Sequence, residues 1–436
     1  MNSSTVPGRI PAGSLSPQLD GKEGYVLGWV HEVRDLGHLI FVVLRDGTGL
    51  CQVSIKVADT PEEVVRRVRG ITNESVVKVW GRVTREPKAR AGVEFKGREV
   101  EVISRTERTV PYDVTGKVDA KLDTRLDHRI LDLRRPENRA IFLIGDTVLS
   151  ACRSFLRERG FIEVRTPRII ATATEGGAAL FEVNYFDRRA YLAQSPQLYK
   201  EELVTVFERV FEIGPFFRAE ESNTTVHINE FTSIDIEAAF ADYNEVMEVL
   251  EKLMVHVYQR VIDERGRELS LLNLNIRVPQ LPFMRVTYDE ALEYLREVGM
   301  EKRWGEDLSV RDMRALTSKY DGFYFITDFP TVTKPFYIKP RDGKPEVSES
   351  FDLVHGWLEL ASGGSRISER SLLERRIVDS GLNPASFQHH LDIYDYGMPP
   401  HAGWGLGYER LLMIITNRMN VREATLFPRD RTRLTP

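Results

Sequence analysis

The sequence has little cysteine and lacks any long apolar segment. Only two cysteines, Cys51 and Cys152, occur among its 436 residues. Because they fall in different predicted domains, neither a disulfide framework nor a zinc site is expected, and a reducing cytoplasm is the simplest setting. No run of about 18 apolar residues is present, so no membrane-spanning helix is expected. Residues 1–20 lack the apolar core of a signal peptide, and we expect a flexible N-terminal arm there.

A strongly basic surface is also missing. The net charge of −5 argues against a general coat for binding nucleic acid. Residues 1–110 are slightly basic and the remainder is acidic, so attraction to phosphate should be local and strongest near the N-terminal end, although chance explains so small an asymmetry equally well. With 42% hydrophobic and 29% charged residues, the chain is typical of a globular protein of two or three domains.

Residues 21–108 have the pattern of a small β-domain. Alternating apolar residues and runs of β-formers predict five strands, and one short helix is expected at 62–70. This content fits a closed OB-fold barrel, although a fragment of a β-sandwich fits the strand count nearly as well. The predicted strands cover residues 24–33, 39–44, 50–55, 75–83 and 93–103.

The rest of the chain mixes helices and strands, which predicts an α+β protein. Residues 109–137 are polar and are expected to form a hinge linker. Residues 138–436 should form a second domain, in which helical spacing predicts helices at 138–160 and 243–263 and a strand at 322–327.

Three stretches of the second domain stand out. Residues 161–167 form a predicted strand that ends at Pro167, as at a sheet edge or an interface, although a plain strand end is the simpler explanation. Residues 210–240 predict a strand, a polar loop and another strand. Arg218 and Glu220 lie two apart there and would share one face of a strand. Such a pair suits a phosphate-bearing ligand with an amine or base, and a surface salt bridge is the alternative.

The third stretch, residues 403–415, is a glycine-rich strand that runs into an apolar helix. Arg410 falls in the first turn of that helix. Glycines here would let the backbone approach a planar or phosphate-bearing ligand closely. The spacing fits neither the dinucleotide-binding fingerprint nor a P-loop.

In order and content, these stretches resemble motifs 1, 2 and 3 of the class II aminoacyl-tRNA synthetases. The more specific similarity is to the aspartyl-tRNA synthetases of archaeal type, and it covers residues 21–436. It rests on the sequences at residues 171–177, 191–200, 217–221, 396–403 and 427–436. The resemblance implies an antiparallel sheet flanked by helices, an anticodon-binding OB-fold, and a homodimer interface at the strand that ends at Pro167.

The implied reaction joins aspartate to ATP as aspartyl-adenylate and then transfers the aspartyl group to tRNA. Such chemistry needs positioning and neutralisation of phosphate charge rather than a protein nucleophile. The resemblance implies two catalytic arginines, Arg218 at the α-phosphate and Arg410 at the γ-phosphate. The implied ATP site is Arg218, Glu220, His227, Glu359, Gly407 and Arg410. The cofactor Mg²⁺ would be held by Asp352, Glu359 and Ser362, although the two carboxylates fit ordinary surface charge as well.

Aspartate and asparagine have similar shapes and differ in charge. Lys200 and Arg366 match the positions that the family uses for the side-chain carboxylate, and asparagine would leave both cations without their anionic partner. Asparaginyl enzymes of this subgroup typically lack the lysine, so Lys200 favours aspartate. His401 would close over the substrate or stiffen its own loop. Glu175 and Gln197 match positions that the family uses around the α-amino group. The implied aspartate site is Glu175, Gln197, Lys200, Arg218, Ser362 and Arg366.

Two positions depart from the family pattern. Archaeal relatives often carry arginine at the position of Val226, so one contact to ATP is expected to be missing or moved. Relatives usually carry histidine directly after Arg366, where this chain has Ile367, and the role of that histidine cannot be transferred.

The resemblance also implies an anticodon-binding site of His31, Arg34, Phe41 and Gln52, with Phe41 stacking on a base. By composition alone, a strand phenylalanine is more often a core residue. His31 occupies a position where relatives restricted to aspartate tRNA often carry tryptophan. A smaller histidine predicts an enzyme that also charges asparagine tRNA and therefore depends on a partner amidotransferase. Packing of His31 on the barrel surface is the alternative.

Four other functions are weighed against this one. They are an enzyme that charges only aspartate tRNA, an asparagine-specific ligase, a non-catalytic RNA-binding paralogue and an amide-forming asparagine synthetase. Lys200 disfavours the second. The third is disfavoured by the joint presence of Arg218, Glu220, Glu359, Arg366 and Arg410. The fourth would not need the N-terminal barrel.

Overall fold

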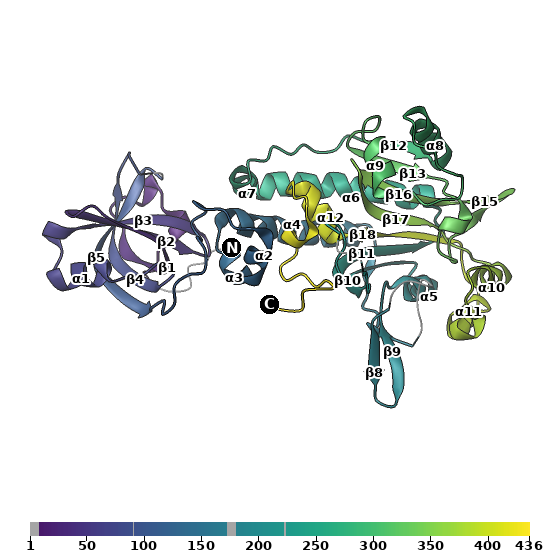
Figure 1. Ribbon diagram of the computed structural model, residues 1–436, viewed down its shortest axis with the longest axis horizontal. Helices are drawn as coiled ribbons and strands as arrows, with labels where there is room; N and C mark the ends of the chain where they lie inside the picture. Colours follow the sequence, from purple (N-terminus) through teal and green to yellow (C-terminus); the bar gives the residue numbers. More distant parts are fainter. Residues whose placement is uncertain (1–7, 90, 172–179, 222–223) are drawn as a thin grey trace. The chain divides into compact units, whose positions relative to one another are not determined.

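The computed structural model describes residues 8–89, 91–171, 180–221 and 224–436. The chain forms two compact units, Met1–Pro136 and Glu137–Pro436, and each is described by itself (Figure 1). In the described part of the chain, no helix combines the length and the apolar character needed to cross a membrane.

The first unit contains a closed five-stranded barrel in the order β1-β2-β3-β5-β4. Alternation places Ile40, Val42 and Leu44 of β2 in its core. Asp46 closes the next turn by accepting hydrogen bonds from the backbone N–H groups of Thr48 and Gly49. The OB-fold prediction is confirmed. The elements are β1 Glu23–Asp35, β2 Leu39–Asp46, β3 Gly49–Lys56, α1 Glu62–Arg69, β4 Val76–Arg85 and β5 Val93–Ser104.

The stretch predicted as a hinge linker contains two short helices, α2 Leu122–Asp127 and α3 Arg129–Asp132. The structure groups all but the last residue of this stretch with the barrel. Arg134 donates to Glu74 at 2.5 Å and Lys117 pairs with Glu32, so two ion pairs attach this stretch to the barrel strands and their loops.

The second unit is built on an eight-stranded sheet in the order β12-β13-β16-β17-β18-β11-β10-β6. The pairs β12–β13 and β10–β6 are parallel and the other neighbours are antiparallel. This confirms the predicted sheet flanked by helices. Its strands are β6 Ile162–Glu163, β10 Arg209–Phe217, β11 Glu230–Ala239, β12 Met284–Thr287, β13 Phe323–Thr327, β16 Ser350–His355, β17 Leu358–Ser365 and β18 His401–Gly407.

Three helices cover one face of this sheet, and their apolar sides share its largest core. They are α4 Pro136–Glu158, α6 Tyr243–Glu264 and α12 Tyr408–Ile415 (Figure 1). The remaining elements are α5 Gln197–Phe207, α7 Gly266–Leu271, α8 Tyr288–Glu297, α9 Val310–Leu316, α10 Arg370–Asp379, α11 Gln388–Tyr394, the sheet β7 Ile169–Ile170, β8 Glu182–Tyr185 and β9 Arg188–Leu192, and the hairpin β14 Pro340–Arg341 and β15 Lys344–Ser348.

Side chains that alternate along β11 give the sheet a polar face opposite the helices. Ile234 and Ile236 point into the core, whereas Ser233 and Asp235 line a cavity. On the neighbouring strand β18, Trp404 likewise lies in the core. The same strands therefore present an apolar face to the helices and a polar face to a binding site.

Two local predictions differ from the structure. The strand expected at residues 161–166 is only two residues long, since β6 pairs with β10 at Ile162 and Glu163 alone. Arg218 and Glu220 do not lie on a strand, because β10 ends at Phe217 and a turn follows, in which the N–H of Glu220 donates to the carbonyl oxygen of Arg218.

Candidate active site

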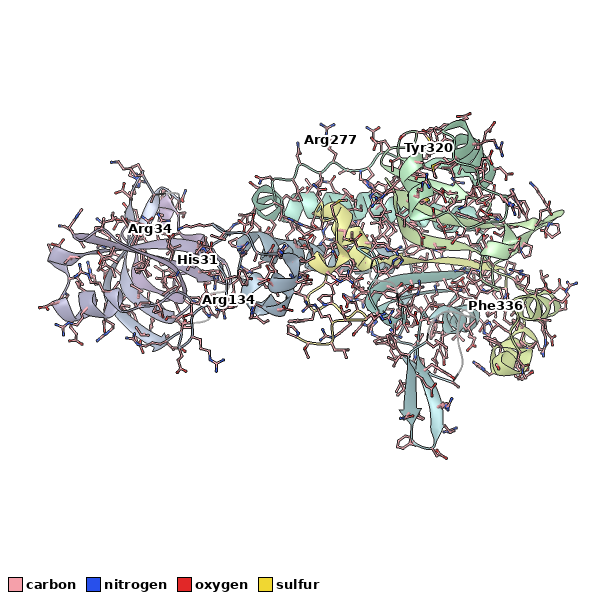
Figure 2. All side chains as sticks on the ribbon, in the orientation of Figure 1. His31, Arg34, Arg134, Arg277, Tyr320 and Phe336 are labelled. Carbon is pink, nitrogen blue, oxygen red and sulfur yellow. The ribbon has the colours of Figure 1, made fainter. Side chains whose placement is uncertain are left out.

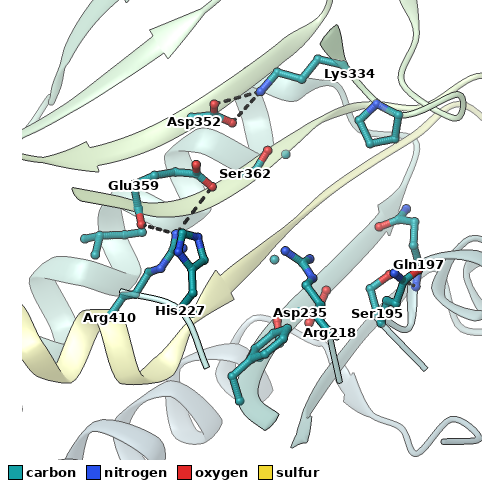
Figure 3. A pocket seen from close by; sticks show the side chains of 18 of the residues that line it. Ser195, Gln197, Arg218, His227, Asp235, Lys334, Asp352, Glu359, Ser362 and Arg410 are labelled. Atoms are coloured by element: carbon teal, nitrogen blue, oxygen red, sulfur yellow. Dashed lines mark hydrogen bonds and ion pairs between the residues drawn. The ribbon is translucent and has the colours of Figure 1, made fainter. Parts of the chain in front are cut away.

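A cavity of about 350 Å³ opens on the polar face of the large sheet. Cross-strand register builds its floor, because Asp352 pairs with Ser362, Ser362 with Gly405, and Gly405 with Asp235. Four neighbouring strands thus place two carboxylates and a hydroxyl in one row. The cavity has two ends of different character, which we call the closed end and the open end (Figure 3).

The closed end is lined by three buried polar residues, Gln197, Asp235 and Arg366, and two more, Lys200 and Glu237, are buried in contact with them. Lys200 Nζ lies 3.0 Å from Asp235 and 3.5 Å from Glu237. Arg366 Nε donates to Glu237 at 2.9 Å, and its Nη2 donates to the amide oxygen of Gln197 at 3.3 Å. Two cations and two carboxylates therefore form a network that is shielded from bulk water, where such interactions are strong.

Glycine is required at one point of this network. A Cβ on Gly403 would lie 2.2 Å from the carbonyl oxygen of Ile236 and 2.3 Å from the carboxylate of Glu237. At Gly405 the Cβ would approach Asp235 to 3.1 Å. The glycines of β18 thus give the acidic side chains of β11 their space, whereas a Cβ on Gly407 would make only ordinary contacts.

The open end contains Arg218, His227, Lys334, Asp352, Glu359 and Arg410, all of which line the cavity (Figure 3). Arg410 donates to the backbone carbonyl of Glu359 at 2.9 Å. Its side chain is 22% exposed and that of Glu359 is 48% exposed. Arg218 stacks on Phe231, with 5.2 Å between the guanidinium carbon and the ring centre. The guanidinium groups of Arg218 and Arg410 line a wall of the cavity, against which a polyanion could bind.

Neighbouring charges shift the pKa values of two groups at the open end. Partial removal of water from the carboxyl group and then the charge of Asp352 raise the pKa of Glu359. The side chain of Glu359 is nevertheless 48% exposed toward the cavity. Burial and then the positive charge of Arg410 lower the pKa of His227, so its imidazole is neutral near pH 7. His227 Nδ1 lies 2.6 Å from the hydroxyl of Thr224.

The carboxylates of the open end suit a magnesium ion that is shared with a ligand. Asp352, Glu359 and Ser362 offer oxygen donors, but the described residues contain no group of three or more acidic, histidine or cysteine ligands that could hold a metal. Mg²⁺ is commonly bound through one or two carboxylates with substrate phosphates completing its shell. Lys334 Nζ lies 2.8 and 2.9 Å from the two oxygens of Asp352, so this lysine already neutralises one donor.

The structure brings together most of the residues that the sequence singled out. Glu220 and Gly407 line the same cavity. Glu175 lies outside the described residues. His401 is buried, and its Nδ1 bonds the carbonyl oxygen of Pro399. Val226, where relatives often carry arginine, lines the cavity and contributes to the core.

Sequence reasoning missed three participants: Asp235, Glu237 and Lys334. The first two alternate with Ile234 and Ile236, and an acidic residue at every second position of a predicted core strand was the available signal. Nothing in the sequence pattern indicated that Lys334 would contact Asp352, 18 residues further along the chain.

The barrel brings three of the four predicted anticodon residues onto one outer face. Arg34 is the cross-strand partner of Phe41, and Gln52 is the partner of Val43, two residues along from Phe41. Phe41 is half-buried and lies outside the core cluster of the barrel. Arg34 is exposed and donates to Glu32. The face therefore offers an aromatic ring beside a cation, as single-stranded nucleic-acid sites do.

His31 and Arg34 belong to the same strand of the first unit, but His31 is buried whereas Arg34 is exposed (Figure 2). His31 occupies a bulge of β1 and is only 7% exposed. Its Nδ1 lies 3.2 Å from Arg45, which forms two hydrogen bonds with Glu74. Burial and then the charge of Arg45 lower the pKa of His31. Arg134 also bonds Glu74, so His31 belongs to a buried polar layer of the first unit.

Two family models match the chain. Residues 25–103 match an OB-fold nucleic acid binding domain, and residues 121–431 match the class II tRNA synthetases of the D, K and N type. The second match covers more than half of the chain.

Full-length relatives agree with these matches. The chain is 51% identical to an aspartate–tRNA(Asp/Asn) ligase of Archaeoglobus fulgidus, over 98% of this chain and 100% of the relative. It is 52% identical to the ligase of the same name from Methanopyrus kandleri, over 97% and 98%. An aspartate–tRNA(Asp) ligase of Thermoplasma volcanium is 44% identical over 98% and 100%.

Solved structures agree as well. An asparaginyl-tRNA synthetase from Pyrococcus horikoshii, complexed with asparaginyl-adenylate, superposes with a TM-score of 0.94 at 33% identity, covering 99% of this chain and 100% of that one. The barrel and the large sheet thus match proteins of one family along their full length. The chain belongs to the class II tRNA synthetases of the D, K and N type.

Proposed function

We propose that the protein is an aspartate–tRNA ligase that activates L-aspartate with ATP and transfers it to tRNA(Asp) and tRNA(Asn). The observation that carries the choice of amino acid is the pair of buried cations at the closed end, Lys200 and Arg366. Lys200 and Arg366 offset the charges of the buried carboxylates Asp235 and Glu237, so a substrate carboxylate can enter beside them and pair with Arg366. A neutral amide would add no charge for that guanidinium to pair with. The names of the full-length relatives support the same activity.

The two ends of the cavity divide the work of the first step. Gln197, Lys200, Ser362 and Arg366 would bind aspartate so that its α-carboxylate faces the open end. Arg218 and Arg410 would hold the α- and γ-phosphates of ATP, and Glu220 and His227 would line the base and phosphate path. The arginines stabilise the charge that develops as the carboxylate attacks the α-phosphorus and pyrophosphate leaves. In the second step, the terminal ribose hydroxyl of tRNA takes the aspartyl group.

Magnesium fits the donor set of the open end. Mg²⁺ bound with ATP neutralises phosphate charge, and Asp352, Glu359 and Ser362 are the residues that would hold it. The pairing of Asp352 with Lys334 supplies a positive charge at the same carboxylate when the nucleotide is not bound.

The deciding experiment is pyrophosphate exchange with ATP, measured with aspartate and with asparagine as the amino acid. We expect exchange with aspartate and on the order of 10³-fold less with asparagine. Exchange with asparagine alone would identify an asparaginyl enzyme. Absence of exchange with either would leave a non-catalytic RNA-binding protein.

The choice of tRNA is tested separately, by charging purified tRNA(Asp) and tRNA(Asn) transcripts. Histidine at position 31 and the names of the Archaeoglobus fulgidus and Methanopyrus kandleri relatives, which are more similar in sequence than the tRNA(Asp) ligase of Thermoplasma volcanium, support charging of both. Because His31 is buried, its influence would pass through Arg45 and Glu74 to the barrel face rather than through a direct base contact. Charging of tRNA(Asp) alone would make the enzyme discriminating. Charging of both would require an amidotransferase to convert aspartyl-tRNA(Asn).

We also propose that two copies of the chain associate. The edge strand β6 precedes Pro167 and exposes Ile162, which supports an interface at this edge of the sheet. Closed two-fold dimers are the commonest soluble assembly. Light scattering should give about twice the chain mass of 50.0 kDa, and a fully active monomer at micromolar concentration would contradict the interface.

A cytoplasmic location is consistent with the two thiols. Cys51 and Cys152 are free and buried, and burial raises the pKa of each to about 12. Neither is poised for disulfide exchange.

A further inference from the structure

Glu201, a buried acidic residue next to the closed end, takes no direct part in the proposed reaction. Glu201 lies one helical turn after Gln197 on α5, and it is completely buried. Its Oε1 accepts a hydrogen bond from the side-chain amide nitrogen of Gln197 at 2.7 Å. An isolated buried carboxylate is costly, so its neighbours must compensate the charge.

Three side chains from two other elements surround Glu201. On α11, Tyr394 donates to Glu201 at 2.9 Å, and His390 Nε2 lies 3.4 Å from the carboxylate. On β18, His401 Nε2 lies 3.8 Å away. The other ring nitrogen of His390 faces Glu202 at 3.0 Å, so both of its nitrogens meet carboxylates, as a protonated imidazole requires.

The orientation of the Gln197 amide follows from these contacts. Its nitrogen faces two carboxylates, Glu201 at 2.7 Å and Glu237 at 3.3 Å, and a carboxylate can only accept hydrogen bonds. Its oxygen accepts from Arg366 at 3.3 Å. A flipped amide would place oxygen against both carboxylates and nitrogen against a guanidinium. The network therefore holds the amide oxygen as an acceptor at the cavity wall.

We infer that Glu201 is a positioning residue for recognition of the substrate's α-amino group. It locks Gln197 with the amide oxygen available to the ammonium. This role rests on the proposed activation of aspartate. A glutamine at position 201 could donate as well as accept, so it would no longer favour one amide orientation.

The experiment compares two ligands that differ only in the α-amino group. They are the sulfamoyl analogue of aspartyl-adenylate and its desamino, succinyl counterpart, whose binding to the full-length protein is measured by calorimetry. In Glu201→Gln, we expect the amino-bearing analogue to bind at least roughly 10-fold more weakly and the desamino analogue to change by less than about 2-fold. The ratio of the two dissociation constants is the readout, because a general loss of packing would weaken both ligands together.

Glu202→Gln is the matched control, since Glu202 is the next residue on α5 and contacts His390 but makes no described contact with Gln197. Its ratio should stay within about 2-fold of the wild-type ratio. If Glu201→Gln does not fold, Tyr394→Phe removes one hydrogen bond to Glu201 and should shift the ratio by roughly 2- to 5-fold in the same direction.

Equal weakening of both analogues, or an unchanged ratio in the variant that folds, would overturn the positioning role. A wild-type protein that binds neither analogue would instead refute the proposed function, so the two failures are distinguishable.

Discussion

The two ends of the cavity solve the problem of charge in different ways. At the closed end, Lys200, Arg366 and Glu237 are buried and paired with one another at fixed distances. At the open end, Glu359 and Arg410 keep part of their surface exposed and are joined by one hydrogen bond to the backbone. A small substrate of fixed shape, such as an amino acid, is bound well by charged groups that are held rigidly in place. A flexible polyanion that brings its own metal ion is better served by groups that can adjust.

The closed end should be the more sensitive to loss of a charge. In Lys200→Leu, Asp235 and Glu237 lose their buried cation and would repel an incoming carboxylate. We expect aspartate-dependent pyrophosphate exchange to fall by roughly 10²-fold or more, with little change in the KM for ATP. Lys252→Leu, which removes an exposed lysine paired with Glu248, is the control. Unchanged aspartate kinetics in Lys200→Leu would remove this lysine from substrate binding and reopen the asparagine alternative.

Two glycines of β18, Gly403 and Gly407, test whether the closed end is more tightly packed than the open end. Alanine at Gly403 would overlap the Ile236 carbonyl and the Glu237 carboxylate, so Gly403→Ala should lower the free energy of unfolding by about 2 kcal/mol and raise the KM for aspartate. Alanine at Gly407 would meet its nearest atom, Cδ of Arg410, at 3.6 Å, and should change stability by less than about 0.5 kcal/mol. Urea unfolding of both variants makes the comparison. Equal effects would mean that the closed end is no more tightly packed than the open end.

The sequence predicts the secondary-structure elements of this site better than the contacts between their side chains. Alternation and turn residues located the barrel strands, and the family motifs led to Lys200 and Arg366. The pairing of Lys200 with Asp235 spans 35 residues and that of Arg366 with Gln197 spans 169, and no periodic pattern encodes such contacts. Periodicity also misplaced Arg218, because the length of a strand depends on its neighbours and β10 ends one residue earlier.

The barrel gives a similar lesson at His31. The family resemblance predicted that His31 lies at the anticodon side of the barrel. The bulge of β1 shifts the register between Val30 and Glu32, and His31 is buried against Arg45. A bulge is fixed by the pairing of two strands, so a single strand's sequence does not reveal it.

The charge network behind the closed end should make stability depend on pH. Although burial alone would lower it, the carboxylates of Glu201 and Glu202 raise the pKa of His390 to about 9. A raised histidine pKa stabilises the folded state fully below pH 6.5, and this contribution is lost as the pH rises through 9. We expect the free energy of unfolding to fall by ~2–3 kcal/mol across this interval.

His390→Gln isolates this contribution from that of other groups. Burial raises the pKa of Glu409 to about 7, so Glu409 contributes a decline that is complete near pH 7. Between pH 7 and 9, the wild-type protein should therefore lose stability and the variant should lose much less. Parallel curves for the two proteins in this interval would show that His390 does not hold an extra proton in the folded state.

The smallest expected effect lies at the open end, where Lys334 shares Asp352 with the magnesium ion that we propose. The lysine lies within hydrogen-bond distance of both Asp352 oxygens and 3.7 Å from the ring centre of Phe329, so it can retreat to the aromatic face when a metal ion arrives. Lys334→Met keeps the length of the side chain and removes its charge. Asp352 then has no competing cation, and we expect the Mg²⁺ concentration for half-maximal ATP binding to fall by roughly 3- to 10-fold. Titration of nucleotide binding with Mg²⁺ measures this, and the KM for aspartate should stay within about 2-fold because the closed end is untouched. A higher Mg²⁺ requirement in the variant would mean that Lys334 binds phosphate itself. The charged groups of the open end would then be as fixed in their role as those of the closed end.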